Sequence, residues 1–217
     1  MNNLVMWGTH ASVKRISDSI CEKTYTDYTL IAIKDHVISS ELFNKIKELD
    51  LNTFVKLYNY NYDPSRRQII SYTMEYYSPN DIDIMLINSS YIVSCFEKIY
   101  NDVITLSKNN VLIGDMNFSN IIFGDIIKVI DFDNYQLSNL SFEDILKNNM
   151  NELCFCFKNN YKIALYNEYS RSGFINYGID NTMKLFDPRV EDLPSHVKKK
   201  LLKYDNMLEY FKDNSGK

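Results

Sequence analysis

The chain of 217 residues contains little glycine, proline or cysteine, with 6, 4 and 4 residues respectively. So few glycines and prolines exclude a collagen-like or low-complexity architecture. The 45% hydrophobic and 24% charged residues are ordinary for a globular protein and exclude a mostly disordered chain. The length allows one domain or two small lobes, with enough residues to bury a sizeable core.

The cysteines and histidines also lack the spacing of a structural cross-link. The four cysteines form neither a disulfide framework nor a CxxC zinc pattern, and the pair Cys154-x-Cys156 is typical of buried thiols. The histidines are too scattered for a metal site; they are His10, His36 and His196. We therefore expect a protein of the reducing cytoplasm.

An excess of positive charge and long apolar runs are both missing. The 24 basic and 28 acidic residues give a formal net charge of −4. Nucleic-acid binding needs a basic face, so no nucleic-acid partner is expected. No segment approaches the roughly 18 apolar residues of a membrane span, and the N-terminus shows no secretory signal. We expect no membrane partner, and the sequence leaves the oligomeric state open.

Hydrophobic patterning divides the chain into a strand-rich first third and a helix-rich remainder. Early apolar and β-branched segments predict strands over 12–17, 28–34, 54–60 and 68–77. Between the first two strands, the polar segment 18–27 is typical of a turn. Helical spacing of apolar residues predicts a helix over 40–49, which Ser39 or Ser40 caps.

A break at 78–81 separates this part from the remainder. Helical periodicity predicts helices over 89–108, 142–157 and 194–210. Two short strands, 120–123 and 126–132, are joined by the turn residues Gly124 and Asp125. The fold class predicted from this pattern is α+β.

Three oxygen-bearing side chains flank these two short strands. Asp115 precedes the first strand on a loop, Asn120 begins it, and Asp131 lies at the end of the second. A short turn brings the outer ends of two strands together. Two carboxylates and an amide oxygen suit Mg²⁺, which prefers hard oxygen ligands. Each residue alone is an ordinary turn former, whereas their joint spacing favours a functional site.

The motif Asp115-x-x-x-x-Asn120 followed by Asp131-Phe132 resembles the catalytic loop and metal-binding motif of the protein-kinase-like superfamily. Four upstream segments resemble the family in the same order, so that the similarity covers residues 6–137. They are 8–13 (a reduced nucleotide-covering loop), 30–34 (the strand with the phosphate-contacting lysine), 54–58 (the strand after the N-lobe helix) and 71–77 (the sheet end and hinge).

The resemblance implies a two-lobed fold, with an antiparallel-sheet N-lobe over 1–77 and a mainly helical C-lobe over 78–217. It implies ATP- and Mg²⁺-dependent transfer of the γ-phosphate to a hydroxyl acceptor. The type that it suggests is a compact, atypical bacterial or phage Ser/Thr kinase-like protein.

Catalytic roles follow from the same resemblance. Asp131 is expected to hold Mg²⁺, Asn120 to take the second metal position, and Asp115 to orient the acceptor hydroxyl and accept its proton. Lys34 is expected to pair with the nonterminal phosphates, with Lys14 as a weaker rival.

A helix carboxylate is expected to hold this lysine, Glu41 first and Glu48 second. The remaining nucleotide-binding positions are Gly8 in the loop, Val13 and Ala32 around the adenine ring, Met74 as gatekeeper, and Glu75 to Tyr77 as the hinge backbone.

Departures from the family pattern keep alternatives open. Gly114 before the catalytic Asp resembles small-molecule kinases of the aminoglycoside or choline type, and Asn117 replaces the lysine of Ser/Thr kinases. Asp133 places a second carboxylate near the metal. The short segment 80–90 leaves no room for a large acceptor-binding insertion, which favours a protein acceptor. The reduced loop keeps a pseudokinase binding module as a third possibility.

The acid that usually anchors the catalytic loop from the central C-lobe helix is also undecided. Asp144, Asn151 and Glu152 are all candidates in the helix predicted over 142–157.

Overall fold

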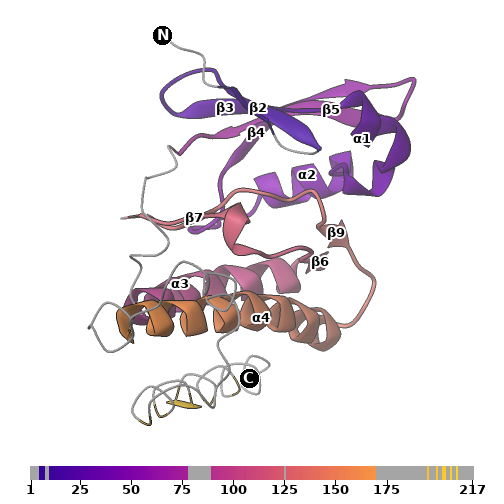
Figure 1. The fold of residues 1–217 in the computed structure, drawn as a ribbon. Helices are drawn as coiled ribbons and strands as arrows, with labels where there is room; N and C mark the ends of the chain where they lie inside the picture. Colours follow the sequence, from indigo (N-terminus) through magenta and orange to yellow (C-terminus); the bar gives the residue numbers. More distant parts are fainter. Residues whose placement is uncertain are drawn as a thin grey trace.

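A computed structural model describes residues 5–7, 10–77, 89–124 and 126–169, together with residues 195, 199, 202, 203, 206 and 209. Gly8 and most of the helix predicted over 194–210 lie outside the described residues. Figure 1 shows an antiparallel sheet with α2 beneath it, short strands in the middle, and the long helices α3 and α4 on the far side.

The sheet has five antiparallel strands in the order β1-β2-β3-β5-β4. Their bounds are Val5–Trp7 (β1), Ala11–Arg15 (β2), Ile20–Tyr25 (β3), Leu57–Asp63 (β4) and Gln68–Glu75 (β5). In β3 the side chains of Cys21, Lys23 and Tyr25 are buried, and Thr24 between them is exposed. This alternation places a lysine on the core-facing side of the central strand.

Two early assignments from the sequence are wrong. The segment predicted as a turn, 18–27, contains β3, and the strand predicted over 28–34 is helical, with α1 at Asp27–Ala32 and η1 at Lys34–His36. Thr26 caps α1, because its hydroxyl accepts a hydrogen bond from the Thr29 backbone N–H at 3.2 Å. β-branched content misled the prediction, since strand propensity depends on what a face packs against.

The helix predicted over 40–49 is confirmed as α2, Ser40–Lys47. The Ser39 hydroxyl caps it by accepting a hydrogen bond from the Leu42 N–H at 3.1 Å. Phe43 packs under the sheet, with its ring centroid 5.7 Å from that of Tyr72 and 5.0 Å from that of Tyr60. The strands predicted over 54–60 and 68–77 correspond to β4 and β5, which pair antiparallel.

Helices α3 (Ser89–Lys108) and α4 (Phe142–Tyr169) pack along each other, as Figure 1 shows. Both confirm predictions, although α4 continues beyond the predicted end at residue 157. An apolar stripe on α3 is fully buried; it contains Ile92, Phe96, Ile99, Val103 and Leu106. The ring of Phe96 meets that of Phe157 on α4 edge to face, with centroids 5.7 Å apart.

Two short antiparallel ribbons lie between the sheet and the helices. Strands β7 (Ile121–Ile122) and β8 (Lys128–Val129) form the predicted pair, and β6 (Val111–Leu112) pairs with β9 (Gln136–Leu137). The short helix η3, Phe118–Asn120, precedes β7.

Strand β8 also bonds the segment that leads into β4. Val129 donates its N–H to the Thr53 carbonyl at 2.7 Å and accepts from the Val55 N–H at 3.0 Å. Asp102 on α3 supports the same segment, since its carboxylate accepts from both the N–H and the hydroxyl of Thr53, each at 2.6 Å. These bonds join the sheet part to the helical part.

A single cluster of buried hydrophobic residues extends from the sheet to α3 and α4. At the junction, the ring of Phe54 lies 5.9 Å from that of Phe132 and 6.4 Å from that of Tyr135. The fold is therefore a mixed α/β arrangement with an antiparallel sheet and helices, compatible with a kinase-like fold. The predicted lobe boundary at residues 77 and 78 stays a prediction, because residues 78–88 are outside the described ranges. None of the described helices is long and apolar enough to cross a membrane.

Asn149 on α4 supports the start of the loop that carries Asp115. Its side chain is fully buried; Oδ1 accepts from the Ile113 N–H at 2.7 Å, and Nδ2 donates to the Val111 carbonyl at 2.8 Å and to the Ser107 hydroxyl at 2.9 Å. The sequence offered Asp144, Asn151 and Glu152 for this anchor, and the structure places Asn149 there instead. A neutral amide fits because the site needs one acceptor and two donors.

The variant Asn149→Ala is expected to lose about 2–4 kcal/mol of unfolding free energy, because buried backbone groups of Ile113 and Val111 lose their partners. Urea denaturation followed by circular dichroism measures this loss. Asn151→Ala, on the exposed side of the same helix, is the matched control and is expected to stay within about 0.5 kcal/mol of the parent. Equal losses in the two variants would contradict the anchoring role.

Candidate functional site

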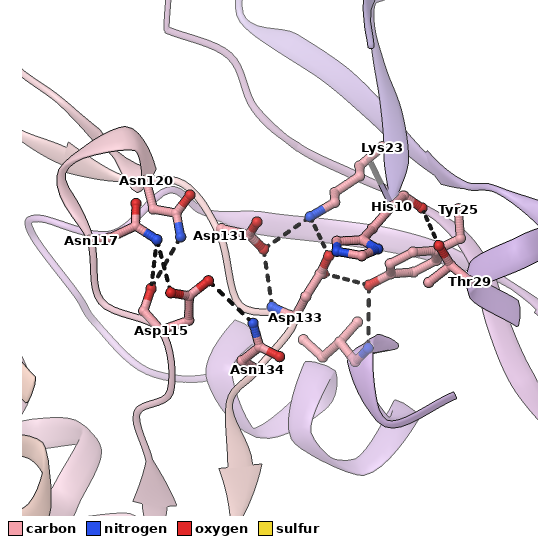
Figure 2. A network of polar contacts seen from close by, with 11 residues as sticks. His10, Lys23, Tyr25, Thr29, Asp115, Asn117, Asn120, Asp131, Asp133 and Asn134 are labelled. Carbon is pink, nitrogen blue, oxygen red and sulfur yellow. Dashed lines mark hydrogen bonds and ion pairs between the residues drawn. The ribbon is translucent and has the colours of Figure 1, made fainter. Parts of the chain in front are cut away.

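Lys23 connects the central strand of the sheet to the loop after β8. Its Nζ lies 2.9 Å from Oδ1 of Asp131 and 2.6 Å from Oδ2 of Asp133, and its side chain is 7% exposed. Figure 2 shows the amine between the two carboxylates. One buried cation therefore faces two acids that are two residues apart in the chain.

Burial and charge act in opposite directions on this group. Burial by itself lowers the pKa of the Lys23 amine, but the charges of Asp133 and Asp131 outweigh burial and raise the pKa above its ordinary value. For Asp133, burial raises the pKa of the carboxyl to about 6, against the lowering effect of the Lys23 charge. At neutral pH the amine is therefore charged and Asp133 is ionised.

Tyr25 extends this network into the sheet part. Its hydroxyl donates to Oδ1 of Asp133 at 2.7 Å and accepts from the Ile38 N–H at 3.2 Å. Burial, followed by the neighbouring charge of Asp133, raises the pKa of Tyr25 well above its usual value. The phenol consequently stays protonated and remains a donor, so both oxygens of Asp133 are engaged.

Asp115 lies exposed at the centre of a ring of amide donors. Its backbone is in the left-handed region at φ +53°. Asn117 donates to Oδ1 at 2.9 Å and Asn134 donates to Oδ2 at 3.4 Å, while Asn120 donates to the Asp115 carbonyl at 3.1 Å. Figure 2 shows these side chains turned toward Asp115. The carboxylate is oriented by neutral groups and keeps its charge for a ligand.

The strand ends bring Asn120 and Asp131 together, as their spacing predicts, while their binding of a metal stays a prediction. The Ile130 N–H donates to the Asn120 carbonyl at 2.9 Å, which holds the two strand ends together. Oδ1 of Asp131 accepts from Lys23 and from the Asp133 N–H at 3.0 Å. Within the described part of the chain, no hydrogen bond is made to Oδ2 of Asp131 or Oδ1 of Asn120.

These two oxygens fit Mg²⁺ bound together with phosphate and water. Magnesium in phosphate sites typically takes one or two protein oxygens and completes its octahedron with water and substrate oxygens. The described residues contain no group of three histidine, cysteine or acidic side chains suited to a metal by themselves. Asp133 is not a third ligand, because its two oxygens bind Lys23 and Tyr25.

The lysine predicted for phosphate binding is misplaced. Lys34 lies exposed in η1 rather than on a strand, and Lys14 is exposed on β2. Among the described lysines, Lys23 is the one that pairs with Asp131. The β-branched and aromatic residues of this strand, Ile20, Thr24 and Tyr25, are its sequence signal, and the adjacent charged residues Glu22 and Lys23 concealed it.

The placements of Ala32 and Glu41 are also wrong. Ala32 is the exposed last residue of α1, and Glu41 is exposed on α2 with no ion pair to any described lysine; the same is true of Glu48. Cys21, two residues before Lys23, takes the inward position expected of Ala32. It lies opposite Met74 in the sheet, with Sγ 3.8 Å from the Met74 carbonyl.

Val13 and Met74 both lie in the sheet on strands that flank β3. Val13 on β2 is opposite Lys23 in register, and Met74 is buried near the end of β5. Neither position tests the binding of a nucleotide, so the roles assigned to both stay predictions. Burial raises the pKa of the Cys21 thiol, which lies between them, to about 11, so this thiol remains protonated.

The hinge expected at Glu75 to Tyr77 is held by a lysine that the sequence did not single out. Buried Lys128 on β8 lies 3.5 Å from Oε2 of Glu75 and 5.2 Å from the ring centre of Tyr77. The Tyr77 hydroxyl donates to Oε1 of Glu75 at 2.8 Å; burial, with this hydrogen bond, raises the pKa of Tyr77 to about 12. The acidic and phenolic side chains therefore bind each other.

Comparisons with known proteins show a likeness in structure but none in sequence. No family model matches the chain, and no curated protein matches it. Among solved structures, the chain is similar to the kinase PK-1 of the Cydia pomonella granulovirus, with a TM-score of 0.48 and 15% sequence identity. The alignment covers 64% of this chain and 55% of that chain, so only about half of the viral kinase is matched.

Gly114 is required by the close approach of two loops. A Cβ at this position would overlap the backbone carbonyl oxygen of Asn134 and lie 3.0 Å from its carbon. Gly114→Ala is therefore expected to push the Asp115 loop away and to lower the unfolding free energy by about 1–3 kcal/mol. Thermal unfolding tests this, with Asn101→Ala on the exposed face of α3 as control. An unchanged melting temperature for Gly114→Ala would show that Gly114 and the Asn134 carbonyl leave room for a Cβ.

Proposed function

We propose that this protein is an ATP- and Mg²⁺-dependent phosphotransferase that moves the γ-phosphate to a hydroxyl acceptor. The observation that carries the proposal is the buried ion pair of Lys23 and Asp131 beside the exposed carboxylate of Asp115. Phosphoryl transfer depends on positioning and charge neutralisation, and such a set of groups provides both. Lys23 takes the role that the sequence assigned to Lys34.

In this proposal the phosphates lie beside the Lys23–Asp131 ion pair. The amine contacts the nonterminal phosphates, and Asp131 with Asn120 holds Mg²⁺ against the triphosphate through oxygens that no described residue engages. Bound Mg²⁺ supplies neutralisation of the negative charge that develops on the transferred group. The adenine ring lies under the sheet between Val13, Cys21 and the hinge, where backbone groups after Met74 contact its edge.

Asp115 orients the acceptor hydroxyl and takes its proton. Its carboxylate is exposed, and the amides of Asn117 and Asn134 fix its direction without neutralising its charge. A general base needs a fixed direction and access to the acceptor hydroxyl, and an exposed carboxylate held by two amides offers both.

The acceptor that we favour is a protein serine or threonine hydroxyl, in a compact two-lobed kinase-like domain. The short segment 80–90 leaves little chain for the insertion that small-molecule kinases of this fold carry. Gly114 before Asp115 is the feature that favours a small-molecule acceptor instead. A pseudokinase is disfavoured because a binding module has no chemical need for Asp115, Asn120 and Asp131 together.

The decisive assay is transfer of label from γ-labelled ATP in the presence of Mg²⁺. Asp115→Asn is expected to lower turnover by about 10²–10⁴-fold, because the general base is lost, while nucleotide affinity changes little. Asp35→Asn, exposed on η1, is the control and is expected to transfer label at the parent rate. Equal rates for Asp115→Asn and the parent would remove Asp115 from the mechanism.

The position of the label separates the three functions. Label in protein supports a protein kinase, and free phosphate alone indicates a missing small acceptor. A folded wild-type protein that consumes no ATP would support the pseudokinase.

A comparison of Lys23→Ala with Lys34→Ala tests which lysine contacts the phosphates. Lys23→Ala is expected to lower kcat/KM for ATP by at least about 10²-fold, because one preorganised cationic donor is lost. Lys34→Ala is expected to leave kcat/KM unchanged, because the side chain is exposed in η1, whereas Asp131 pairs with Lys23. Lys23→Arg keeps the charge and controls for loss of folding. A larger loss for Lys34→Ala would restore the assignment made from the sequence.

A further inference from the structure

We propose that Asp133 is the residue that positions Lys23 for the phosphates, in place of a carboxylate from helix α2. This inference rests on the proposed phosphotransferase function and concerns how the same site is assembled. Asp133 acts through Lys23 and is therefore a positioning residue.

The contacts of Asp133 distinguish it from Asp131. Both oxygens of Asp133 are engaged, Oδ2 by Lys23 at 2.6 Å and Oδ1 by Tyr25 at 2.7 Å, and its side chain is 7% exposed. Asp131 engages Oδ1 alone and is 31% exposed. A buried carboxylate with two fixed donors holds one geometry, whereas the more exposed one keeps an oxygen for an incoming ligand.

Helix α2 offers no competing charge. Its inward face consists of Leu42, Phe43 and Ile46, all buried, and Glu41 points to the exposed side. Since an apolar face cannot hold an ammonium group, Lys23 depends on the loop after β8 for its orientation. The Tyr25 hydroxyl then links Asp133 to the Ile38 N–H, which joins the chain just before α2 begins.

A regulatory consequence follows from this arrangement. The lysine and the metal-binding acid are aligned by one loop, in which the Asp133 N–H donates to Asp131 at 3.0 Å. A shift of α2 breaks no ion pair at the site. A movement of α2 therefore reaches the site only through the hydrogen bond from the Ile38 N–H to Tyr25, and it does not separate Lys23 from its two acids.

The test measures the affinity of the full chain for the nonhydrolysable analogue AMP-PNP with Mg²⁺ by calorimetry. Asp133→Asn keeps the size of the side chain but removes its charge and replaces one accepting oxygen by a donor, and is expected to weaken binding about tenfold. Glu41→Gln, which removes the helix carboxylate that the sequence suggested, is expected to bind within about twofold of the parent. Equal weakening by Glu41→Gln, or none by Asp133→Asn, would overturn the proposal.

A double-mutant cycle shows whether Asp133 acts through Lys23. In a Lys23→Met background, Asp133→Asn is expected to cause no further loss of affinity, because the group that it positions is gone. A full additional loss in that background would show a separate role, such as metal binding, and would overturn the proposal. If Asp133→Asn fails to fold, Tyr25→Phe replaces it, since it removes one fixed donor and keeps every charge; a weakening of about threefold is expected, and unchanged affinity would count against the proposal.

Failure of the inference and failure of the proposed function give different results. Wild-type protein that binds AMP-PNP with Mg²⁺ but transfers no label would overturn the phosphotransferase, while the affinities still decide the role of Asp133. Transfer by the wild type together with unchanged binding by Asp133→Asn would overturn the inference alone. Wild-type protein that binds no nucleotide would overturn both.

Discussion

The structure depends on the buried amine of Lys23. The alternation of β3 turns this side chain into the core, where an unpaired charge is too costly to persist. The acids that compensate it come from the loop after β8, so that loop must lie beneath the sheet. The backbone bonds of Val129 to the segment before β4 hold the loop there. A single electrostatic requirement thus brings together parts of the chain that are 108 and 110 residues apart.

Neutral amides complete the site where charge is not needed. Asn149 holds the backbone at Ile113, and Asn117 and Asn134 orient Asp115. An amide both donates and accepts, so it satisfies buried backbone groups without adding a counter-charge. The negative charge of Asp115 therefore faces outward, directed but unpaired by any cation of the described residues. This division, with ion pairs around Lys23 and amides around Asp115, suits a cationic phosphate contact on one side and a base on the other.

Several elements were predictable because their signal is local. The helices α2 and α3 show apolar spacing that burial confirms, and the strands on both sides of Gly124 pair as their turn predicts. The spacing of Asp115, Asn120 and Asp131 brought these three residues together, although their catalytic roles stay predictions. The anchor Asn149 was missed, because Asn149, Asn151 and the acids around them look alike until the helix is placed against α3.

By itself, the sequence determined helices α2, α3 and α4, strands β4, β5, β7 and β8, and the approach of Asp115, Asn120 and Asp131, since hydrophobic period and turn chemistry act over a few residues. It did not show the short ribbon of β6 and β9, whose strands are far apart in the chain. Only the tertiary structure decided which lysine pairs with Asp131 and which second carboxylate contacts it. Apolar residues precede both Lys34 and Lys23 in the sequence. Lys23, however, points from β3 into the core and meets two acids there, whereas Lys34 lies in η1. An ion pair between residues more than 100 positions apart leaves no local pattern, because its partners are chosen by the register of the sheet and by the cost of burying a charge.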